Sequence, residues 1–375
     1  MYIEIEEDII KDAISKSNNV VNTSLDLLYL FALSAYKGRH YITVPCLVNN
    51  KDLCSKLQQI MSKRILNMLR SAEREYVQWK TIRENVIVHA VVTYKKLNPQ
   101  NDIIIVDPHD ESNFEPYTKC RVLTEHINDS AFFEYLVRFY KNTHNLSKCK
   151  TCFDPLMGGG FTTADILMHE VCNREHFCLV ISDSDKKWPN GKNGETAIKI
   201  ENVMNSLKPF NCYFYVMKDV MEIENLIPKK VFDVIACERF GYKKIFEKES
   251  SYFDMKKGLC ISDLYNDRIC KYWKELLKDE PINFSERDTA KKNSKNKEAY
   301  LKEIKDKHYA NQLCAGFGTD LLEMCVLKDK NVAHPEVVDI LNNIKREDLT
   351  DAQLKEWMNI GQIMFSWTCC SRVHQ

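Results

Sequence analysis

From Lys119 to Pro228, strand-like and helix-like runs alternate, and this alternation restricts the possible folds more than any other feature of the chain. The apolar runs predicted as strands are Cys120–Leu123, Thr151–Leu156, Phe177–Ser182 and Cys212–Met217. The amphipathic runs predicted as helices are Ser130–Lys141, Thr163–Asn173 and Glu195–Leu207. A helix between two strands returns the chain to the same end of the sheet. The pattern therefore predicts an α/β fold with a four-stranded parallel sheet flanked by helices.

The chain of 375 residues has room for more than this sheet. Residues 1–115 begin with a helical run and then contain apolar extended runs, which predicts an N-terminal α/β domain. The expected strands there are His40–Val48, Val86–Tyr94 and Ile103–Val106. The acidic, proline-containing segment Asp107–Thr118 is typical of a linker. We expect the sheet domain at 116–240 and a helical C-terminal region at 241–375, where Asn311–Leu327 and Leu354–Trp367 have helical spacing.

Composition excludes several classes of function. Lys and Arg (53) balance Asp and Glu (53), so nucleic-acid binding must rely on a local basic segment. Two segments qualify, Lys51–Arg83 and Lys291–Lys307, although a solvated helix face is the preferred explanation of the first. The longest early apolar run, Leu25–Leu33, is too short to span a membrane, and the acidic start does not resemble a secretory signal.

Fifteen scattered cysteines, many inside apolar runs, favour reduced core thiols and a cytoplasmic protein. The only CxxC pair, Cys149 and Cys152, has no second pair or histidine pair nearby. It is either a zinc half-site or, more simply, part of the packed core.

Carboxylates follow the predicted strands, where ligands bind in open α/β sheets. Glu125 follows the first strand, and Asp183 and Asp185 follow the third. Carboxylates that meet at one sheet edge repel one another unless a cation offsets their charge, and their hard oxygens suit Mg²⁺ or Mn²⁺. Such an ion can activate water against a phosphodiester. The pattern therefore indicates a divalent metal site.

Each of these acids also has a structural explanation. Asp183 or Asp185 can shape a turn or cap a helix, and Glu125 alone can be a surface carboxylate. After the fourth strand, either Glu222 or Glu224 can balance a helix dipole, with Glu224 the preferred further ligand.

The glycines Gly158–Gly160 permit either an anion-binding loop or a tight strand-to-helix turn. No Gly-Lys-Ser/Thr follows them, and the dinucleotide GxGxxG pattern is absent, which argues against ATP and NAD.

With these residues identified, Lys119–Pro228 resembles a Toprim domain, the metal-binding α/β module of topoisomerases, primases and several nucleases. The motifs that resemble it are Glu125-x₃-Asp129 after the first strand, Gly158–Gly160 after the second, and Asp183-Ser184-Asp185 after the third. The acidic stretch Glu222–Leu226 is similar to one in the overcoming-lysogenization-defect and phage-defence branch. The sequence departs from the family at His126, where glycine is usual.

The resemblance implies a metal-dependent nuclease, a hydrolase that cuts RNA or DNA. Its implied catalytic residues are Glu125, Asp183 and Asp185, which would bind Mg²⁺ or Mn²⁺ together with Asp129 and Glu224. One nearby lysine would assist; the candidates are Lys186, Lys187, Lys229 and Lys230. The resemblance further implies a toxic effector in bacterial antiviral defence, controlled by a separate partner such as an ATPase, and it leaves an oligomer open.

Two other functions fit the same residues. The sheet can serve as a non-catalytic module that senses nucleic acid or a nucleotide while the helical ends bind a protein partner. A receiver-like phosphate-transfer domain is a weaker alternative, because the acidic pair expected after the first strand is missing.

Overall fold

The computed structural model of the chain falls into two compact units. The sheet unit comprises Met1–Ser182, Ile198–Tyr215 and Trp357–Gln375, and the loop unit comprises Asp183–Ala197 and Val216–Glu356. The described residues are all of 1–375 except 20, 49, 71–75, 97–101, 109–117, 174–175, 236–249, 280–282, 307–311, 327–334 and 372–375. Most of the predicted linker and the ends of the predicted segment 311–327 lie outside the described residues.

The N-terminal part of the sheet unit is a four-stranded parallel sheet in the order β2-β1-β3-β4. Its strands are β1 (Tyr2–Ile5), β2 (Tyr41–Thr43), β3 (His89–Val92) and β4 (Ile103–Val106). The predicted α/β character is confirmed. The helices expected near the start are present at 7–15 and 23–36, but they follow a central strand, Tyr2–Ile5, that was not predicted. The predicted strand at 40–48 ends at Thr43, and Pro45 begins a 3₁₀ turn because it lacks the N–H that a ladder needs.

Short helices surround this first sheet. They are α1 (Glu7–Ser15), α2 (Thr23–Tyr36), α3 (Lys51–Ile60), α4 (Lys63–Leu69) and α5 (Tyr76–Asn85). In the described part of the basic segment 51–83, the helical spacing corresponds to α3, α4 and most of α5. The break after α3 has a local cause, because Met61 is extended and the Ser62 side chain caps α4 by accepting from the Ile65 N–H.

The second sheet is the one that the alternating pattern predicts. Its order is β7-β5-β8-β9, with β5 paired in parallel with both β7 and β8. Its strands are β5 (Cys120–Thr124), β7 (Phe153–Met157), β8 (Cys178–Ser182) and β9 (Cys212–Val216). The predicted strand at 151–156 is divided, because Thr151 belongs to β6 (Lys150–Thr151), which pairs antiparallel with β12 (Cys369–Cys370).

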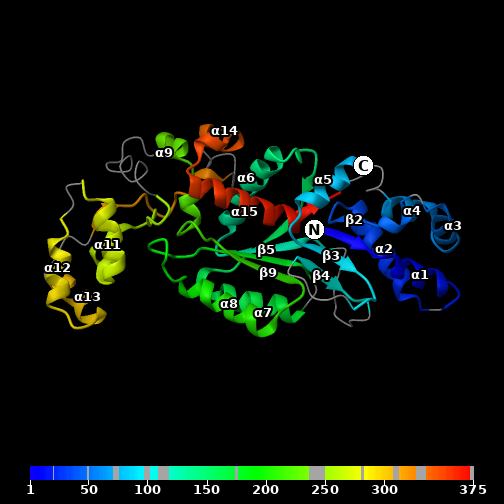
Figure 1. Cartoon of the computed structure of the whole chain (residues 1–375), viewed down its shortest axis with the longest axis horizontal. Helices are drawn as coiled ribbons and strands as arrows, with labels where there is room; N and C mark the ends of the chain where they lie inside the picture. The colour runs from blue at the N-terminus through cyan, green and yellow to red at the C-terminus, as the bar shows by residue number, and fades with distance from the viewer. Residues whose placement is uncertain are drawn as a thin grey trace. The chain divides into compact units, whose positions relative to one another are not determined.

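Helices cover both faces of the second sheet (Figure 1). They are α6 (Ile127–Thr143), α7 (Thr163–Asn173), α8 (Glu195–Leu207) and α15 (Asp351–Thr368). The predicted bounds of α7 and α8 are confirmed. On one face, Leu167 of α7 and Ile200 of α8 pack on Leu123 of β5. On the other face α15 lies close to α6, because Gly361 has no side chain to hold the helices apart: an added Cβ would lie 2.7 Å from Leu136 O.

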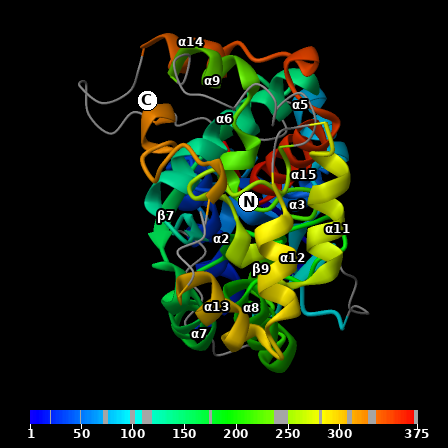
Figure 2. The ribbon, with the colours of Figure 1, turned by 90° about the vertical axis from the view of Figure 1, so that its left-hand side faces the viewer.

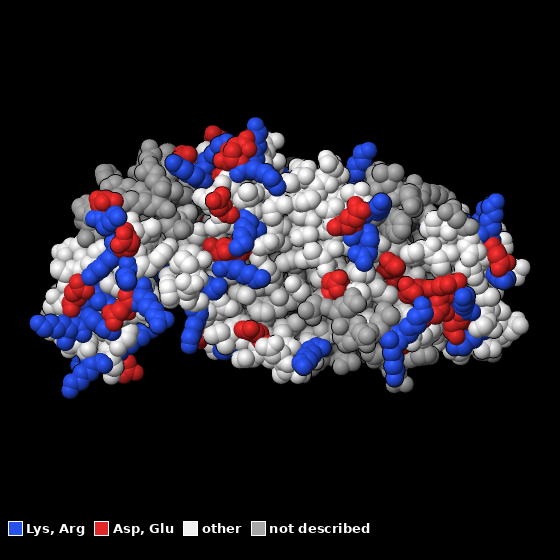
Figure 3. Space-filling view, in the orientation of Figure 1, with Lys and Arg blue, Asp and Glu red and all other residues white. Residues whose placement is uncertain are grey.

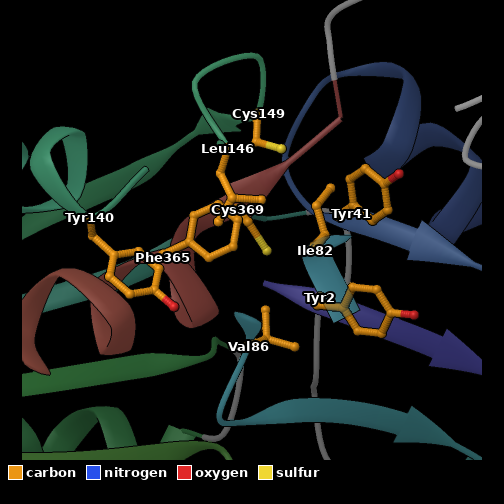
Figure 4. Close-up of a cluster of buried hydrophobic side chains, with 9 residues drawn as sticks. All are labelled: Tyr2, Tyr41, Ile82, Val86, Tyr140, Leu146, Cys149, Phe365 and Cys369. Atoms are coloured by element: carbon orange, nitrogen blue, oxygen red, sulfur yellow. The ribbon is translucent and has the colours of Figure 1, made fainter. Parts of the chain in front are cut away.

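A buried aromatic cluster joins the two sheets of this unit (Figure 4). Tyr2 and Tyr41 of the first sheet stack with ring centroids 6.0 Å apart, and Tyr140 of α6 meets Phe365 of α15. Cys149, from the CxxC pair, packs in the same cluster. Burial of large aromatic surface of this kind is a main source of folding free energy. The two sheets therefore share one core.

The loop unit holds the segments that leave β8 and β9 together with short helices (Figure 2). Its elements are α9 (Lys229–Ile235), β10 (Gly258–Cys260), α11 (Asp267–Leu276), α12 (Ser285–Lys292), α13 (Lys297–Asp306), β11 (Gln312–Ala315) and α14 (Pro335–Asn342). The helix predicted over 311–327 is wrong, because β11 pairs antiparallel with β10. Tyr300 and Ile304 of α13 pack with Ala290 of α12 against Ile261. Among the described residues, no helix is both long and apolar enough to cross a membrane.

We expect Gly361→Ala to destabilise the chain by about 1–3 kcal/mol, because its Cβ would press on the Leu136 carbonyl and force α15 away from α6. This cost outweighs the ~1 kcal/mol that alanine gains over glycine in helix propensity. Urea unfolding measures the difference. Asn359→Ala, two residues earlier on the same helix, is the matched control, and equal stability of the two variants would contradict the close contact.

Candidate functional site

The loop that follows β8 is held in place by hydrogen bonds to the segment that follows β9. The Ser184 and Asp185 N–H groups both donate to Met221 O, at 3.0 and 2.9 Å. The buried Ser184 hydroxyl donates to Val220 O at 2.6 Å. The Ile223 N–H donates to Asp183 Oδ1 at 2.9 Å. The two segments that carry the predicted acids are therefore fixed to each other.

Three carboxylates gather where these segments meet, and we name Asp183, Glu222 and Glu224 the acidic cluster. Glu222 and Glu224 are only 5% and 3% exposed. The ammonium of Lys256 lies between them, 3.4 Å from Glu222 Oε2 and 3.1 Å from Glu224 Oε1. Asp183 also contributes to the negative potential at Lys256. The cluster thus brings two buried acids and the half-buried Asp183 together around one cation.

The pKa shifts follow from this arrangement. The pKa of Glu222 is raised to about 8, chiefly by burial and next by the neighbouring Glu224, whereas Lys256 and the Met255 N–H act in the opposite direction. Glu224, Glu222 and Asp183 raise the pKa of Lys256 and overcome the effect of its burial. Lys256 is therefore charged, and Glu222 titrates where a small change in surroundings alters its protonation.

Buried amides hold the acidic segment rigid. The Asn225 side chain accepts from the Glu222 N–H (2.8 Å) and donates to the carbonyls of Ser250 and Phe253. The buried Gln353 amide donates to Asn225 O and Ile227 O, both at 2.9 Å. These bonds satisfy polar groups that would otherwise be costly to bury, and they fix the backbone of both glutamates.

Asp185 lies at the edge of this arrangement in a strained conformation. Its φ of 53° is left-handed, a region that costs energy for a residue with a side chain. Gly194 is close because it has no side chain: an added Cβ would lie 2.1 Å from Asp185 Oδ2. Partial desolvation raises the pKa of Asp185, while Lys256 and Lys187 lower it. Aspartate is among the few residues with a side chain that adopt this conformation readily.

The first-strand acids belong to the sheet unit. Glu125 follows β5, and its carbonyl accepts from the Gly159 N–H at 2.8 Å. A Cβ added to Gly160 would lie 3.6 Å from Glu125 Oε2, so the glycine turn lies against this carboxylate. The Gly158 N–H likewise donates to Thr124 O. Of the two interpretations of the glycine run, these bonds support the tight strand-to-helix turn.

Asp129 has a local structural role. Its carboxylate accepts from the His126 N–H at 2.8 Å, in a capping box at the start of α6. His126, where Toprim domains usually have glycine, has a φ of −129°, an extended conformation open to any residue. The cap accounts for Asp129 without a metal.

The predicted lysines mostly have other partners. Lys187 pairs with Asp263 at 2.6 Å, and Lys230 pairs with Asp348 at 2.5 Å. Lys186 donates to Lys218 O at 3.3 Å, and Lys229 is exposed at the start of α9. The lysine beside the acids is Lys256, which sequence reasoning missed. It lies 32 positions after Glu224 in sequence, and no motif connects the two.

Across the described residues, no group of three or more His, Cys, Asp or Glu side chains is arranged to hold a metal ion. In the acidic cluster the place of a cation is taken by the Lys256 ammonium. Comparison of the chain with family models, known proteins and solved structures gives no match. Functional inference therefore depends on the residues themselves.

We expect Lys256→Met to destabilise the chain by about 1–3 kcal/mol, because it leaves two buried glutamates without a counter-charge. The value lies below the ~3–5 kcal/mol of a fully buried pair, since the Lys256 side chain is 36% exposed. Urea unfolding without divalent ions measures it. The double variant Lys256→Met/Glu224→Gln should recover part of the loss, and the neighbouring, exposed Lys257→Met is the control. Equal stability of the Lys256 and Lys257 variants would contradict this electrostatic role.

Proposed function

We propose that the chain is a Mg²⁺- or Mn²⁺-dependent nuclease that hydrolyses phosphodiester bonds of RNA or DNA. The observation that carries the proposal is the acidic cluster, in which the half-buried Asp183 after β8 is held beside the segment of the buried Glu222 and Glu224 after β9, around the Lys256 ammonium. The order of motifs along the chain, which resembles a Toprim domain, supports the same chemistry.

The donor atoms suit a hard divalent ion. All are carboxylate oxygens, and Glu224 Oε2 is buried with no hydrogen-bond partner in the described part of the chain. The ligands we propose are those that the resemblance implies: Asp183, Asp185 and Glu224 of the loop unit, and Glu125, which belongs to the sheet unit. The described residues do not by themselves form a metal site, so binding of the ion would have to bring the ligands together. Asp129 is the least suited of the implied ligands because it caps α6. An ion bound there would lower the pKa of a water molecule and stabilise the leaving oxygen.

The remaining roles fall to residues around the ligands. Lys256 supplies positive charge that can shift from the glutamates to a substrate phosphate. Glu222, with its pKa near 8, is suited to accept or release a proton close to neutral pH. Asn225 and Gln353 keep this constellation in place through their backbone contacts.

The biological setting of the proposal comes from the resemblance to the phage-defence branch of Toprim nucleases. We propose a toxic effector of bacterial antiviral defence, active in the cytoplasm and restrained by a separate partner protein such as an ATPase. The many cysteines fit a reducing compartment. A regulated effector explains how a cell tolerates a nuclease.

A second function, a non-catalytic nucleic-acid or nucleotide sensor, is favoured by one observation. Lys256 already pairs with both Glu222 and Glu224, so the cluster is stable as a structural ion-pair group. In such a sensor the acids would maintain the loop geometry and perform no chemistry.

Cleavage of labelled total RNA and plasmid DNA in Mn²⁺ tests the proposal. We expect Glu125→Gln and Asp183→Asn to lower the cleavage rate by roughly 100-fold or more, because each removes charge that stabilises the transition state. Asp165→Asn, an exposed acid at the start of α7, is the matched control and should cleave normally. Unchanged cleavage in Asp183→Asn would refute the assignment, and no cleavage by wild type, alone or with its partner, would favour the sensor.

A further inference from the structure

A cavity of about 690 Å³ lies in the loop unit, between the loop after β8 and helix α11. Its volume is in the range of ~300–1,000 Å³ typical of small-molecule sites. Trp188 and Pro189 line it from the loop, and Arg268, Lys271, Tyr272 and Leu276 line it from α11. Two aromatic rings and two cations thus face the same space.

The loop sequence places Trp188 at this position. Trp188–Gly191 forms a turn in which the Gly191 N–H donates to Trp188 O at 2.9 Å, with Pro189 at the second position, where its fixed φ is favoured. A Cβ on Gly191 would lie 3.2 Å from Trp188 Cδ1, so the indole lies against the turn. The preceding residue, Lys187, pairs with Asp263 just before α11. The indole is therefore held toward α11 before any ligand arrives.

Helix α11 divides into two faces. Cys270 and Trp273 are buried in the unit, whereas Arg268, Lys271 and Tyr272 recur at helical spacing along the cavity. Tyr272 is half-buried and packs edge-on against Tyr252 and Trp273, which fixes its ring. The cavity wall is therefore rigid on its aromatic side.

The charge of the cavity is positive. Within the described residues, neither the Arg268 nor the Lys271 side chain has an ion-pair partner, and both residues are exposed. By contrast, Lys274 on the same helix pairs with Asp288 at 2.7 Å. The acid at the cavity, Glu275, is paired with Lys278 at 3.3 Å. Figure 3 shows lysine and arginine side chains, mixed with acidic ones, over the α11–α13 region.

We propose that this cavity, which we name the base pocket (Trp188, Tyr272, Arg268 and Lys271), binds an unpaired base of a single-stranded nucleic acid. Aromatic rings offer stacking surfaces to any base, and the two cations can contact the phosphates that flank it. A base inside a duplex is already stacked on its neighbours and cannot enter such a pocket without leaving the helix. The inference rests on the proposed function for its purpose, which is to hold substrate beside the acidic cluster.

The separation of Trp188 from Asp185 along the chain allows one strand to reach both the base pocket and Asp185. Trp188 lies three residues after Asp185, and three extended residues reach at most about 11 Å. Four nucleotides at ~3.4 Å each span about 14 Å, and single-strand sites cover about 4–16 nucleotides. One strand can therefore place a base in the pocket and a phosphodiester near Asp185.

The test is binding of labelled single-stranded 12-mers of DNA and RNA to the full chain in EDTA, followed by fluorescence anisotropy. Trp188→Ala should weaken binding about ten-fold or more, and Trp188→Phe should retain most of it, because phenylalanine still stacks. Lys271→Ala should reduce the slope of log affinity against log salt by about one phosphate contact. Lys271→Ala leaves the core intact, so it keeps the test informative if an aromatic variant folds poorly.

Two matched controls belong to this experiment. Lys274→Ala removes a lysine of α11 that is already paired with Asp288, and Tyr29→Ala removes an exposed tyrosine of α2. Neither should change the affinity for single strands. Losses in the controls equal to those at Trp188 and Lys271 would overturn the base pocket.

A duplex 12-mer and free AMP test whether the pocket recognises a single strand or another ligand that also carries a base and a phosphate. A duplex 12-mer should bind more weakly than the single strands and lose little affinity in Trp188→Ala, and an equal loss with duplex would overturn the proposal. Free AMP should compete poorly, whereas competition as strong as that of the 12-mer would replace it with a mononucleotide site.

Because EDTA removes divalent ions, binding is measured without cleavage. The outcome for the base pocket is therefore independent of the outcome for the nuclease proposal. Unchanged binding in both Trp188→Ala and Lys271→Ala overturns the base pocket even if Asp183→Asn abolishes cleavage. Binding that depends on Trp188 supports the base pocket even if no protein cleaves.

Discussion

The arrangement of the loop unit depends on one ammonium group between two buried glutamates. Glu222 and Glu224 are almost fully buried, and without Lys256 their mutual repulsion would expel one of them or keep it protonated. Burial, and after it the charge of Glu224, raises the pKa of Glu222 even with the lysine present. A site that gathers more negative charge than one lysine neutralises is predisposed to attract another cation.

The two loops that carry the carboxylates of the acidic cluster are held in place by uncharged side chains. Ser184, Asn225 and Gln353 have no charge to offer, yet their side chains fix the two loops through carbonyl and amide contacts. Such preorganisation matters because an enzyme gains most from charges that need not move during the reaction. The same loop continues through Lys187 to Trp188, so the bonds that fix the acids also define one wall of the base pocket.

Much of the second sheet could be predicted from its sequence. Buried parallel strands read as continuous apolar runs, and the crossover helices have clear polar faces, so β5, β8, α7 and α8 were predicted almost to their ends. The first strand, Tyr2–Ile5, was missed because its alternating glutamates and apolar residues run directly into a helix. Likewise, the strand Gln312–Ala315 pairs with a distant segment, and pairing of that kind leaves no local signal.

The candidate site, like the fold, could be predicted from the sequence only in part. Asp183, Asp185 and Glu224 could be identified because acids after parallel strands have a physical meaning. Lys256 and Tyr272 could not, because only the folded chain brings them to the loops of β8 and β9. At Asp129 the position in a motif suggested a ligand, whereas the folded chain also shows its carboxylate capping a helix.

The most direct test of the account is Mn²⁺ binding to the full chain in the absence of nucleic acid, measured by electron paramagnetic resonance. The account predicts saturable binding that Asp183→Asn and Glu224→Gln each weaken by about ten-fold or more, because even the loss of a supporting group costs a metal site 10- to 100-fold. Asp165→Asn should bind as wild type does. Equal binding by all four proteins, or no binding by any, would contradict the claim that the acidic cluster is a metal site.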